Sequence, residues 1–317
     1  MVEWKSIGNA AGSENMILET EDDFDPGKIA ASGQCFRWQE EAAGFRVTAF
    51  GKVLHLRRLK NGKWRLSCPR RDFDRIWRSY FDLDTDYRRI RAMIPPEDAF
   101  LMRAAEYARG IRILRQDPWE TLITFVISQN RNIPAIRRSV ELLCAAAGTP
   151  ITSEGSAKTP APGDSAPAQV ENPTPLQDGE AFYAFPTPEQ VAGMSGEALD
   201  ACRLGYRRDY VRRAAEEAAS GRLDLKAMAQ LPEREQLEQL TGIYGVGKKV
   251  AGCVMLFGFH DLNAFPMDVW IRRVLDREYG GADRYPFARY APYNGVMQQY
   301  LFEYGRIIEK NRIGGTK

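Results

Sequence analysis

The 317-residue chain has few of the residues that build disulfides, metal centres or membrane spans. Its five cysteines are scattered without a C-x-x-C pair, so neither a disulfide framework nor a zinc site is indicated. The only histidines, His55 and His260, are too few and too separated for a histidine-centred metal or triad site. No run of about 18 apolar residues occurs, so we expect neither a signal peptide nor a spanning helix. These absences favour an intracellular protein of a reducing compartment.

Residues 1–108 have the pattern of an antiparallel sheet with flanking helices. Strands are predicted from Phe45 to Phe50, from Val53 to Leu59 and from Lys63 to Ser67. Asn61-Gly62, between the last two, is a strong signal for a β-hairpin. The sequence therefore predicts a β-sheet domain at the N-terminus.

The pattern becomes helical from Asp117. Asp117 as N-cap, Pro118 at the first helical position and Glu120 three residues after the cap form a helix start. Helices are then predicted to dominate residues 109–147 and 181–317. The expected fold class is α+β, with an antiparallel sheet domain followed by an all-α domain.

Residues 148–180 interrupt the helical region. Six prolines occur there among serine, threonine, alanine and glycine. Such a composition cannot bury enough apolar surface to order itself. We interpret this segment as a disordered surface insert between two helices.

A glycine hairpin is the most informative local feature of the chain. The segment from Glu235 to Leu240 has the pattern of a helix end, and that from Lys249 to Phe257 the pattern of a helix start. Between them, Gly245 and Gly247 let the backbone turn sharply and come close to a ligand. The first amides of the second helix point outward with its positive dipole end. This corner is predicted to bind a phosphate.

Lys249 and Asp268 can be interpreted in two ways. In the ordinary interpretation, Lys249 contacts a phosphate and Asp268 caps the apolar helix that starts at Val269. In the other, an amine and a carboxylate act together on one substrate. A lysine amine can serve as a nucleophile, and a carboxylate can stabilise developing positive charge.

The ordered combination of hairpin, lysine and Pro266-Met267-Asp268 resembles the helix-hairpin-helix DNA glycosylases, in which the lysine marks members that also have lyase activity. Further blocks resemble those of 8-oxoguanine DNA glycosylases of the bacterial type. These blocks are Ser32-Gly33-Gln34-Cys35-Phe36-Arg37-Trp38, Arg115-Gln116-Asp117-Pro118, Ser128-Gln129-Asn130-Arg131-Asn132-Ile133, Leu204-Gly205-Tyr206-Arg207 and Gln298-Gln299-Tyr300-Leu301-Phe302. The serine-glycine-glutamine block is the most specific, because the general superfamily lacks it.

The resemblance implies a bifunctional glycosylase and AP lyase. Lys249 would attack the anomeric carbon of the sugar, and Asp268 would stabilise the oxocarbenium ion. The covalent aminal would open to a Schiff base, which permits strand cleavage 3′ to the lesion by β-elimination.

The resemblance also assigns the base pocket. The backbone carbonyl of Gly33 would accept the N7 hydrogen that 8-oxoguanine has and guanine lacks. Cys253 and Phe302 would sandwich the flipped base, and Gln298 would read its pairing edge. The ordinary alternatives are a simple turn at Gly33 and core positions for Cys253 and Phe302.

Contacts with the duplex follow from the same resemblance. Asn130 would fill the gap left by the flipped base, Tyr206 would wedge beside the orphaned partner, and Arg207 would contact the opposite base. A solvated helix face is the ordinary alternative for the neighbouring Arg212 and Arg213. The contacts expected from the hairpin come from Gly245, Gly247 and Val250.

Two positions depart from the eukaryotic members of the family. Ala135 stands where those members have an arginine that contacts the opposite cytosine, and Trp270 replaces a histidine. We therefore expect relaxed selectivity for the opposite base.

No cofactor is expected. Iron–sulfur relatives use four closely spaced cysteines after the helical domain, and no cysteine follows Cys253, which argues against the endonuclease III and adenine glycosylase branches. A monovalent cation at the hairpin backbone is the one ion left open. The expected partner is double-stranded DNA containing 8-oxoguanine. We expect a monomer that does not associate with a membrane and that acts in the nucleoid of a bacterium or the nucleus of a eukaryote.

Two other hypotheses remain open from the sequence. A glycosylase for alkylated bases or oxidised pyrimidines would keep Lys249 or Asp268 without needing Gly33 and Gln298. A non-catalytic helix-hairpin-helix module would bind DNA without needing Asp268 or a base pocket.

Overall fold

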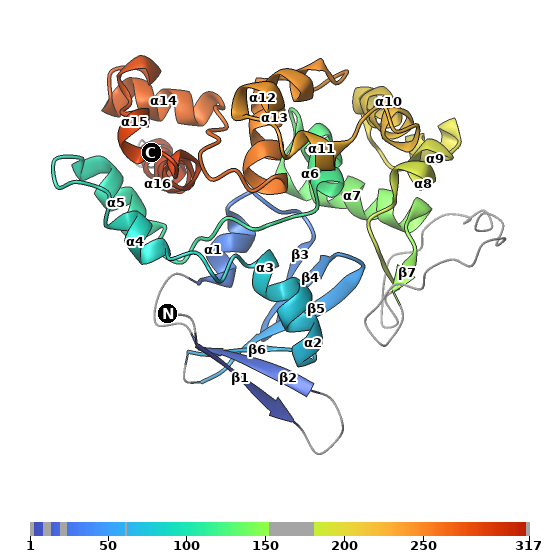
Figure 1. Cartoon of the computed structure of the whole chain (residues 1–317), viewed down its shortest axis with the longest axis horizontal. Coiled ribbons are helices and arrows are strands. Elements are labelled where there is room, and N and C mark those ends of the chain that lie inside the picture. The colour runs from blue at the N-terminus through green and yellow to red at the C-terminus, as the bar shows by residue number, and fades with distance from the viewer. Residues whose placement is uncertain (1–2, 9–13, 20–23, 61, 152–180, 315–317) are drawn as a thin grey trace.

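The computed structural model describes residues 3–8, 14–19, 24–60, 62–151 and 181–314. A β-sheet built from the N-terminal part of the chain lies on one side of the molecule, and helices make up the other side (Figure 1). The expected α+β class, with a sheet followed by a helical part, is confirmed.

The sheet has six antiparallel strands in the order β1-β2-β6-β5-β4-β3. The strands run over Glu3–Gly8 (β1), Glu14–Glu19 (β2), Trp38–Glu41 (β3), Gly44–Ala49 (β4), Lys52–Arg58 (β5) and Trp64–Leu66 (β6). The three predicted strands are present as β4, β5 and β6, with each end displaced by one residue. The turn between β5 and β6 is closed by Gly62, whose amide donates to the Leu59 carbonyl at 3.1 Å. Asn61, which was part of the hairpin prediction, lies outside the described residues.

One face of the sheet forms its own apolar core. Leu54 and Leu56 alternate with more exposed neighbours along β5, which is the period expected of a half-buried strand. Trp38 packs from β3, and Trp77 comes from the π-helix η1. Phe24, Ile29 and Cys35 belong to the same core, which therefore fixes α1 (Pro26–Ala31) and the start of the Ser-Gly-Gln block.

Helices form the remainder of the described chain. In chain order they are α1 (Pro26–Ala31), α2 (Arg70–Asp72), η1 (Phe73–Trp77), α3 (Arg78–Tyr80), α4 (Tyr87–Arg91), α5 (Ala99–Tyr107), α6 (Pro118–Ser128), α7 (Ile133–Ala147), α8 (Pro188–Ala192), α9 (Gly196–Ala201), η2 (Gly205–Arg207), α10 (Arg208–Ala219), α11 (Leu225–Met228), α12 (Glu233–Gly242), α13 (Lys248–Cys253), η3 (Val254–Gly258), α14 (Val269–Glu278), η4 (Ala282–Arg284), α15 (Phe287–Tyr290) and α16 (Asn294–Gly314).

Helix α6 is the centre of the helical core. Its predicted start is confirmed, because the Asp117 side chain accepts from the Glu120 amide at 2.9 Å and Pro118 follows the cap. The helix is apolar on all sides and buried from Thr121 to Ile127, as expected for a helix surrounded by others. The side chains of α4 and α5 also belong to this core, although they precede residue 109. The domain boundaries given above stay a prediction.

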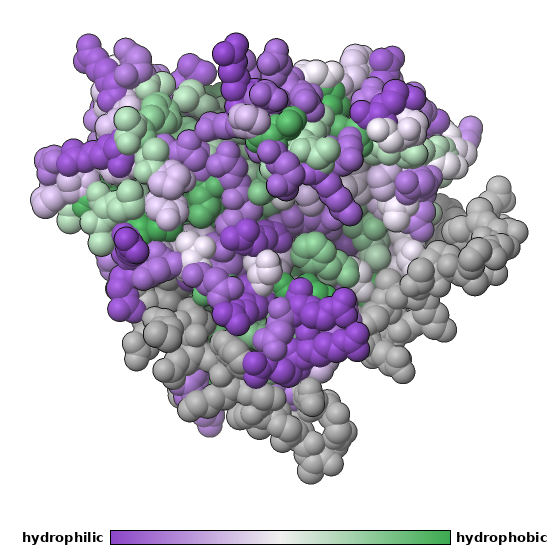
Figure 2. Space-filling model, in the orientation of Figure 1, coloured by the Kyte–Doolittle hydropathy of each residue, from purple (hydrophilic) through white to green (hydrophobic). Residues whose placement is uncertain are grey.

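The predicted insert begins at a short two-stranded ladder. Pro150–Ile151 (β7) pairs with Phe182–Tyr183 (β8), so the chain returns to the place it left. The disordered insert is predicted over residues 148–180; of these, Pro150–Ile151 form β7, and residues 152–180 lie outside the described residues. The visible face is mostly hydrophilic, with small apolar groups scattered between the helices (Figure 2). Over the described ranges, no helix combines the length and apolar character that crossing a membrane requires.

Candidate active site

The glycine hairpin joins α12 to α13 as predicted. Gly245 has a φ of +85°, and a Cβ added there would lie 2.3 Å from the ring of Tyr210. Its carbonyl accepts from Nε2 of Gln129 at 3.1 Å. Gly247 is the N-cap of α13 and has open space around its Cα. The first glycine is therefore fixed by its neighbours, and the second is open to a ligand.

Lys249 is the second residue of α13 and lies over an aromatic ring. Its Nζ is 5.0 Å from the ring centroid of Phe125 on α6. Phe125 in turn meets Phe36 edge to face, with centroids 5.5 Å apart. Phe36 belongs to the Ser-Gly-Gln block, so the predicted nucleophile and the predicted base-recognition loop are joined through one buried phenylalanine.

The Pro-x-Asp segment packs directly against α13. A Cβ added to Gly252 would lie 3.1 Å from the Cα of Pro266, so a side chain there would require the Pro266 backbone to shift. Asp268 caps α14, because its Oδ1 accepts from the Ile271 amide at 2.8 Å. The ordinary interpretation of Asp268 is thus present in the structure. It leaves the second carboxylate oxygen for another role.

Cys253 is buried, with 3% of its surface exposed, and lies within electrostatic reach of both predicted catalytic residues. Burial raises the pKa of its thiol, the positive charge of Lys249 lowers it, and the negative charge of Asp268 raises it further. Lys249 and Asp268 therefore both act on the same buried thiol.

The loop that contains Gly33 is held by Gln34. The Gln34 side chain donates to the Arg112 carbonyl at 3.0 Å and accepts from the Leu114 amide at 2.8 Å. Gly33 has a φ of +76° and open space where a Cβ would be. Backbone conformation therefore favours glycine here, and the space beside it is free for a ligand.

Helix α16 connects the Pro-x-Asp segment to that loop. Gln298 is buried and donates from Nε2 to the Pro266 carbonyl at 3.0 Å. Phe302 lies one helical turn after Gln298. The guanidinium of Arg306, a further turn along, lies over the ring of Phe302, 5.3 Å from its centroid. Arg306 also donates to the Ala31 carbonyl at 3.3 Å, just before the Ser-Gly-Gln block. Gln298 and Phe302 thus come from one helix that contacts both sides of the site.

Asn130 and Tyr206 lie together at the surface. The Asn130 backbone is left-handed, with a φ of +51°, and its Nδ2 donates to the Tyr206 hydroxyl at 3.1 Å. Tyr206 is 52% exposed. These two predicted duplex contacts are paired with each other and open to solvent.

Arg207 is bound to backbone carbonyls in this structure. It is only 6% exposed, and its Nε donates to the Gln129 carbonyl at 2.8 Å. Nη2 donates to the same carbonyl, and Nη1 donates to Leu204. The guanidinium stacks 4.3 Å from the Tyr206 ring centroid. In this structure Arg207 supports its own backbone and Tyr206.

The remaining predicted positions come from four different helices. The Val250 side chain is buried, so the contact with DNA predicted for this residue would come from its backbone. Ala135 is in the first turn of α7, and its amide donates to the Asn132 cap at 2.9 Å. Trp270, in the first turn of α14, is 39% exposed. Arg213, for which a solvated face was an alternative, stacks on an exposed tyrosine next to the hairpin.

Several residues that build the site were not identified from the sequence. Phe125 lies in the apolar helix α6, and Gln129 directly precedes Asn130 in its block. Nothing in the spacing of these two residues marks the contacts that they make. Tyr210 lies in an arginine-rich stretch, and nothing in the sequence marks it as a neighbour of Gly245. Arg306 has no sequence signal. Over the ranges that the structure covers, histidine, cysteine, aspartate and glutamate form no group suited to hold a metal ion.

A lysine directly behind a glycine hairpin, with an aspartate brought to it by a close helix-loop contact, places the chain among the helix-hairpin-helix DNA glycosylases. Residues 16–122 match the family model described as 8-oxoguanine DNA glycosylase, N-terminal domain. The fold resembles the structure of MBOgg1 in complex with a low affinity DNA ligand, with a TM-score of 0.82, 31% identity, and coverage of 97% of this chain and 99% of that one. The chain belongs to the family of 8-oxoguanine DNA glycosylases.

Two further relatives extend the comparison. The 8-oxoguanine glycosylase/lyase of Clostridium acetobutylicum, in complex with double-stranded DNA containing cytosine opposite 8-oxoG, has a TM-score of 0.80 and 28% identity, with 98% of each chain covered. The N-glycosylase/DNA lyase of Saccharomyces cerevisiae is 32% identical over 213 residues. That match covers 63% of this chain and about half (50%) of the yeast protein.

Proposed function

We propose that this protein removes 8-oxoguanine from duplex DNA and then cleaves the strand at the same site. The observation that carries the proposal is the close packing of the Pro-x-Asp segment against the helix of Lys249 at Gly252, with Phe125 linking the lysine to the Ser-Gly-Gln block through Phe36. Family membership supports the same activity.

The nitrogen of Lys249 acts first as the nucleophile and then as part of a Schiff base. Unprotonated Lys249 attacks the anomeric carbon, the bond to the base breaks, and the base departs with the bonding electron pair and takes up a proton. Asp268 lies beside α13 and stabilises the positive charge that develops on the sugar. The aminal then opens to a Schiff base, which acidifies the neighbouring sugar proton. Loss of that proton expels the 3′ phosphate oxygen and cuts the strand.

Base choice rests on a single backbone acceptor. The carbonyl of Gly33 accepts the N7 hydrogen of 8-oxoguanine, whereas guanine would present a lone pair to it. An unsatisfied buried pair costs ~1–3 kcal/mol. Gln298 reads the pairing edge of the base, and Cys253 and Phe302 enclose its faces. The contact of α16 with both Pro266 and the residue before the Ser-Gly-Gln block supports this assignment.

Access to the base requires flipping, which costs a few kcal/mol. Exposed Tyr206 enters the stack beside the orphaned base, and its partner Asn130 fills the vacated space. The hairpin holds the phosphate backbone through Gly245, Gly247 and the amide of Val250, and the same stretch of backbone would hold a monovalent cation, which would supply positive charge towards the phosphate. The protein works as a monomer on chromosomal DNA, in the bacterial nucleoid or the eukaryotic nucleus.

Borohydride trapping on single-lesion duplexes tests the proposal. Wild-type protein should form a covalent adduct with an 8-oxoguanine duplex, and Lys249→Gln should bind that duplex without base release or adduct. Lys248→Gln, one residue earlier in the same turn, is the matched control and should still be trapped.

Three results would contradict the proposal. Trapping by Lys249→Gln would move the nucleophile to another lysine. Wild-type cleavage of duplexes with alkylated bases or oxidised pyrimidines, but not with 8-oxoguanine, would assign a different lesion. Binding without any adduct or cleavage would leave only a DNA-binding module.

A further inference from the structure

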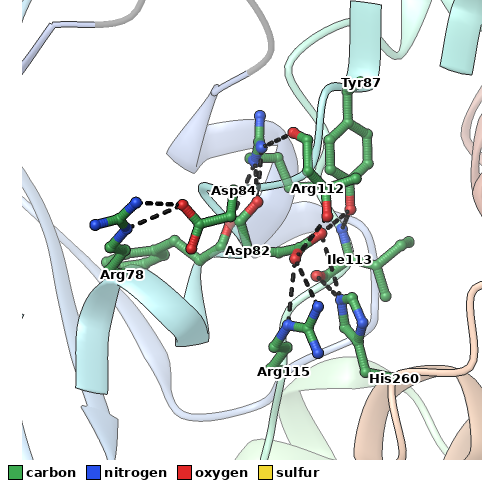
Figure 3. Close-up of polar contacts among 10 residues, drawn as sticks. Arg78, Asp82, Asp84, Tyr87, Arg112, Ile113, Arg115 and His260 are labelled. Carbon is green, nitrogen blue, oxygen red and sulfur yellow. Dashed lines mark hydrogen bonds and ion pairs between the residues drawn. The ribbon is translucent and has the colours of Figure 1, made fainter. Parts of the chain in front are cut away.

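A buried contact between a carboxylate and an imidazole joins the sheet side of the molecule to the helical side. Asp82 follows α3, and His260 follows the π-helix η3 (Figure 3). Their side chains are 1% and 5% exposed, and Nε2 of His260 lies 3.4 Å from Oδ2 of Asp82. We propose that Asp82 and His260 are positioning residues, which hold the base-recognition loop at a fixed place relative to the helix of Lys249.

The pair is built at a conformational cost. Asp82 and His260 have φ values of +50° and +57°, in the left-handed region that side chains other than glycine rarely adopt. Such strain is of order 1–3 kcal/mol for each residue and persists only where surrounding contacts determine it. Two left-handed residues from different parts of the chain therefore meet at one buried contact.

Asp82 is held by several donors. Its Oδ1 accepts from Thr85 Oγ1 at 2.9 Å and from Nε of Arg115 at 3.2 Å, and its Oδ2 accepts from the Tyr87 hydroxyl at 3.0 Å. Burial by itself raises the pKa of Asp82, but the hydrogen bond and charge of His260, with those of Thr85 and Arg115, hold it below its ordinary value. The carboxylate stays ionised in the interior and fixes the groups that surround it.

The segment from Ile111 to Gln116 runs between this pair and the recognition loop. On one side, His260 Nε2 lies 3.1 Å from the Ile113 carbonyl. Both neighbours of Nε2 are acceptors, so Nε2 carries a hydrogen. On the other side, the same segment binds Gln34 at the residues before and after Ile113. Gly33 is thereby connected to His260 through one extended strand of backbone.

The other end of the connection is the helix of the nucleophile. His260 follows η3 directly, and η3 continues α13 without a break. The Gln116 amide donates to the Phe257 carbonyl at 3.0 Å, and its side chain donates to the Gln34 carbonyl at 2.6 Å. Two contacts thus span from η3 to the recognition loop through the same segment. Loosening one of them should let the loop move relative to Lys249.

Loss of the contact between Asp82 and His260 should affect a substrate that carries the lesion base differently from one that is already abasic. Excision of 8-oxoguanine requires the base, held at Gly33, and the sugar, attacked by Lys249, to be aligned together. β-Elimination at a preformed abasic site requires Lys249 but no base contact. A misplacement of about 1 Å can cost on the order of a hundredfold in rate. A positioning role therefore predicts loss of the first reaction and retention of the second.

The test compares the two substrates under single-turnover conditions. His260→Asn and Asp82→Asn suit the purpose, because asparagine tolerates a left-handed backbone. Each should lower the rate of base release from an 8-oxoguanine duplex by about ten- to a hundredfold and leave strand cleavage at an abasic duplex nearly unchanged. The double variant should lose less than the two single effects combined, because both changes remove one contact.

Asp84→Asn is the matched control. Asp84 lies two residues after Asp82 and binds Arg78 in an exposed ion pair (Figure 3), so its loss should affect neither reaction. The inference rests on the proposed function. Wild-type activity on both duplexes distinguishes failure of that function from failure of the positioning role, because wild-type protein that leaves the lesion intact would refute the function itself. With wild-type activity present, equal losses on both substrates, no loss on either, or equal effects from Asp84→Asn would overturn the positioning role.

Discussion

The two glycines of the hairpin should respond differently to the same substitution. Gly245→Ala places a methyl group 2.3 Å from the ring of Tyr210 at a φ of +85°. The left-handed backbone costs ~1–2 kcal/mol and the overpacking ~1–3 kcal/mol. Gly247→Ala enters open space at a φ of −92° and should cost less than about 1 kcal/mol, the penalty of alanine at an N-cap.

Thermal unfolding and DNA binding should therefore separate the two variants. A loss of roughly 2–5 kcal/mol corresponds to a Tm lower by about 5–15 °C in Gly245→Ala, since 1 kcal/mol shifts Tm by roughly 2–4 °C for a chain of this size. Gly247→Ala should unfold near the wild-type temperature. Its methyl group faces the proposed phosphate, so the Kd for duplex DNA should rise by about tenfold, or ~1.4 kcal/mol.

A second substitution tests the origin of the Gly245 effect. Tyr210→Ala in the Gly245→Ala background removes the ring that the methyl group meets and leaves the backbone strain. The double variant should be more stable than the sum of the single effects by ~1–3 kcal/mol. Equal Tm values for Gly245→Ala and Gly247→Ala, or strictly additive effects with Tyr210→Ala, would refute this account of the hairpin.

Three further changes have defined outcomes. Asp268→Asn keeps an N-cap for Ile271, since asparagine caps as well as aspartate, so single-turnover base release should slow while Tm and DNA affinity change little. Ala135→Arg should narrow tolerance for the opposite base, because one good base contact is worth ~1–3 kcal/mol; rates on four duplexes that differ only in that base would show it, and unchanged ratios would contradict it. Burial, opposed by the charge of Arg37, raises the pKa of Glu120 to about 7. Between about pH 4.3 and 7 the folded state therefore holds a proton that the unfolded chain releases, and the free energy of unfolding falls as the pH rises through this range. Glu120→Gln should therefore raise Tm relative to wild type at pH 8 and not at pH 5; a gain of equal size at both values would exclude titration as the cause.

The sequence predicted those parts of the fold that local chemistry determines. The start of α6 at Asp117 depends on a cap within one turn, and the hairpin before α13 depends on Gly245 and Gly247. The strands β4 to β6 alternate clearly around a tight turn. By contrast, β3 is only four residues long, and η1 and η3 differ from α-helices in hydrogen bonding that no residue pattern marks. These elements depend on tertiary packing.

The candidate site divides in the same way. Lys249 and Asp268 could be identified because they follow motifs with a fixed order along the chain. The contacts of Phe125 with Lys249 and Phe36, and that of Asp82 with His260, join segments far apart in sequence. In the sequence alone, His260 is one of two isolated histidines, and no motif indicates a partner for it. Its partner becomes visible only when the two sides of the molecule are brought together.

The placement of Arg207 sharpens the question of how the opposite base is read. Its guanidinium donors are directed to the carbonyls of Gln129 and Leu204, and Gln129 in turn holds the carbonyl of Gly245. Arg207 therefore stabilises the connection between the surface formed by Asn130 and Tyr206 and the glycine hairpin. To reach a base, its donors would have to leave buried carbonyl acceptors, each at a cost of ~1–3 kcal/mol, about the same as one base contact is worth. Since Ala135 has no side-chain donor, we expect Asn130 and Tyr206 to face the opposite strand, where they would act by shape and stacking more than by hydrogen-bond readout. On this proposal, the relaxed selectivity expected from Ala135 would be reinforced by the arginine that the chain retains.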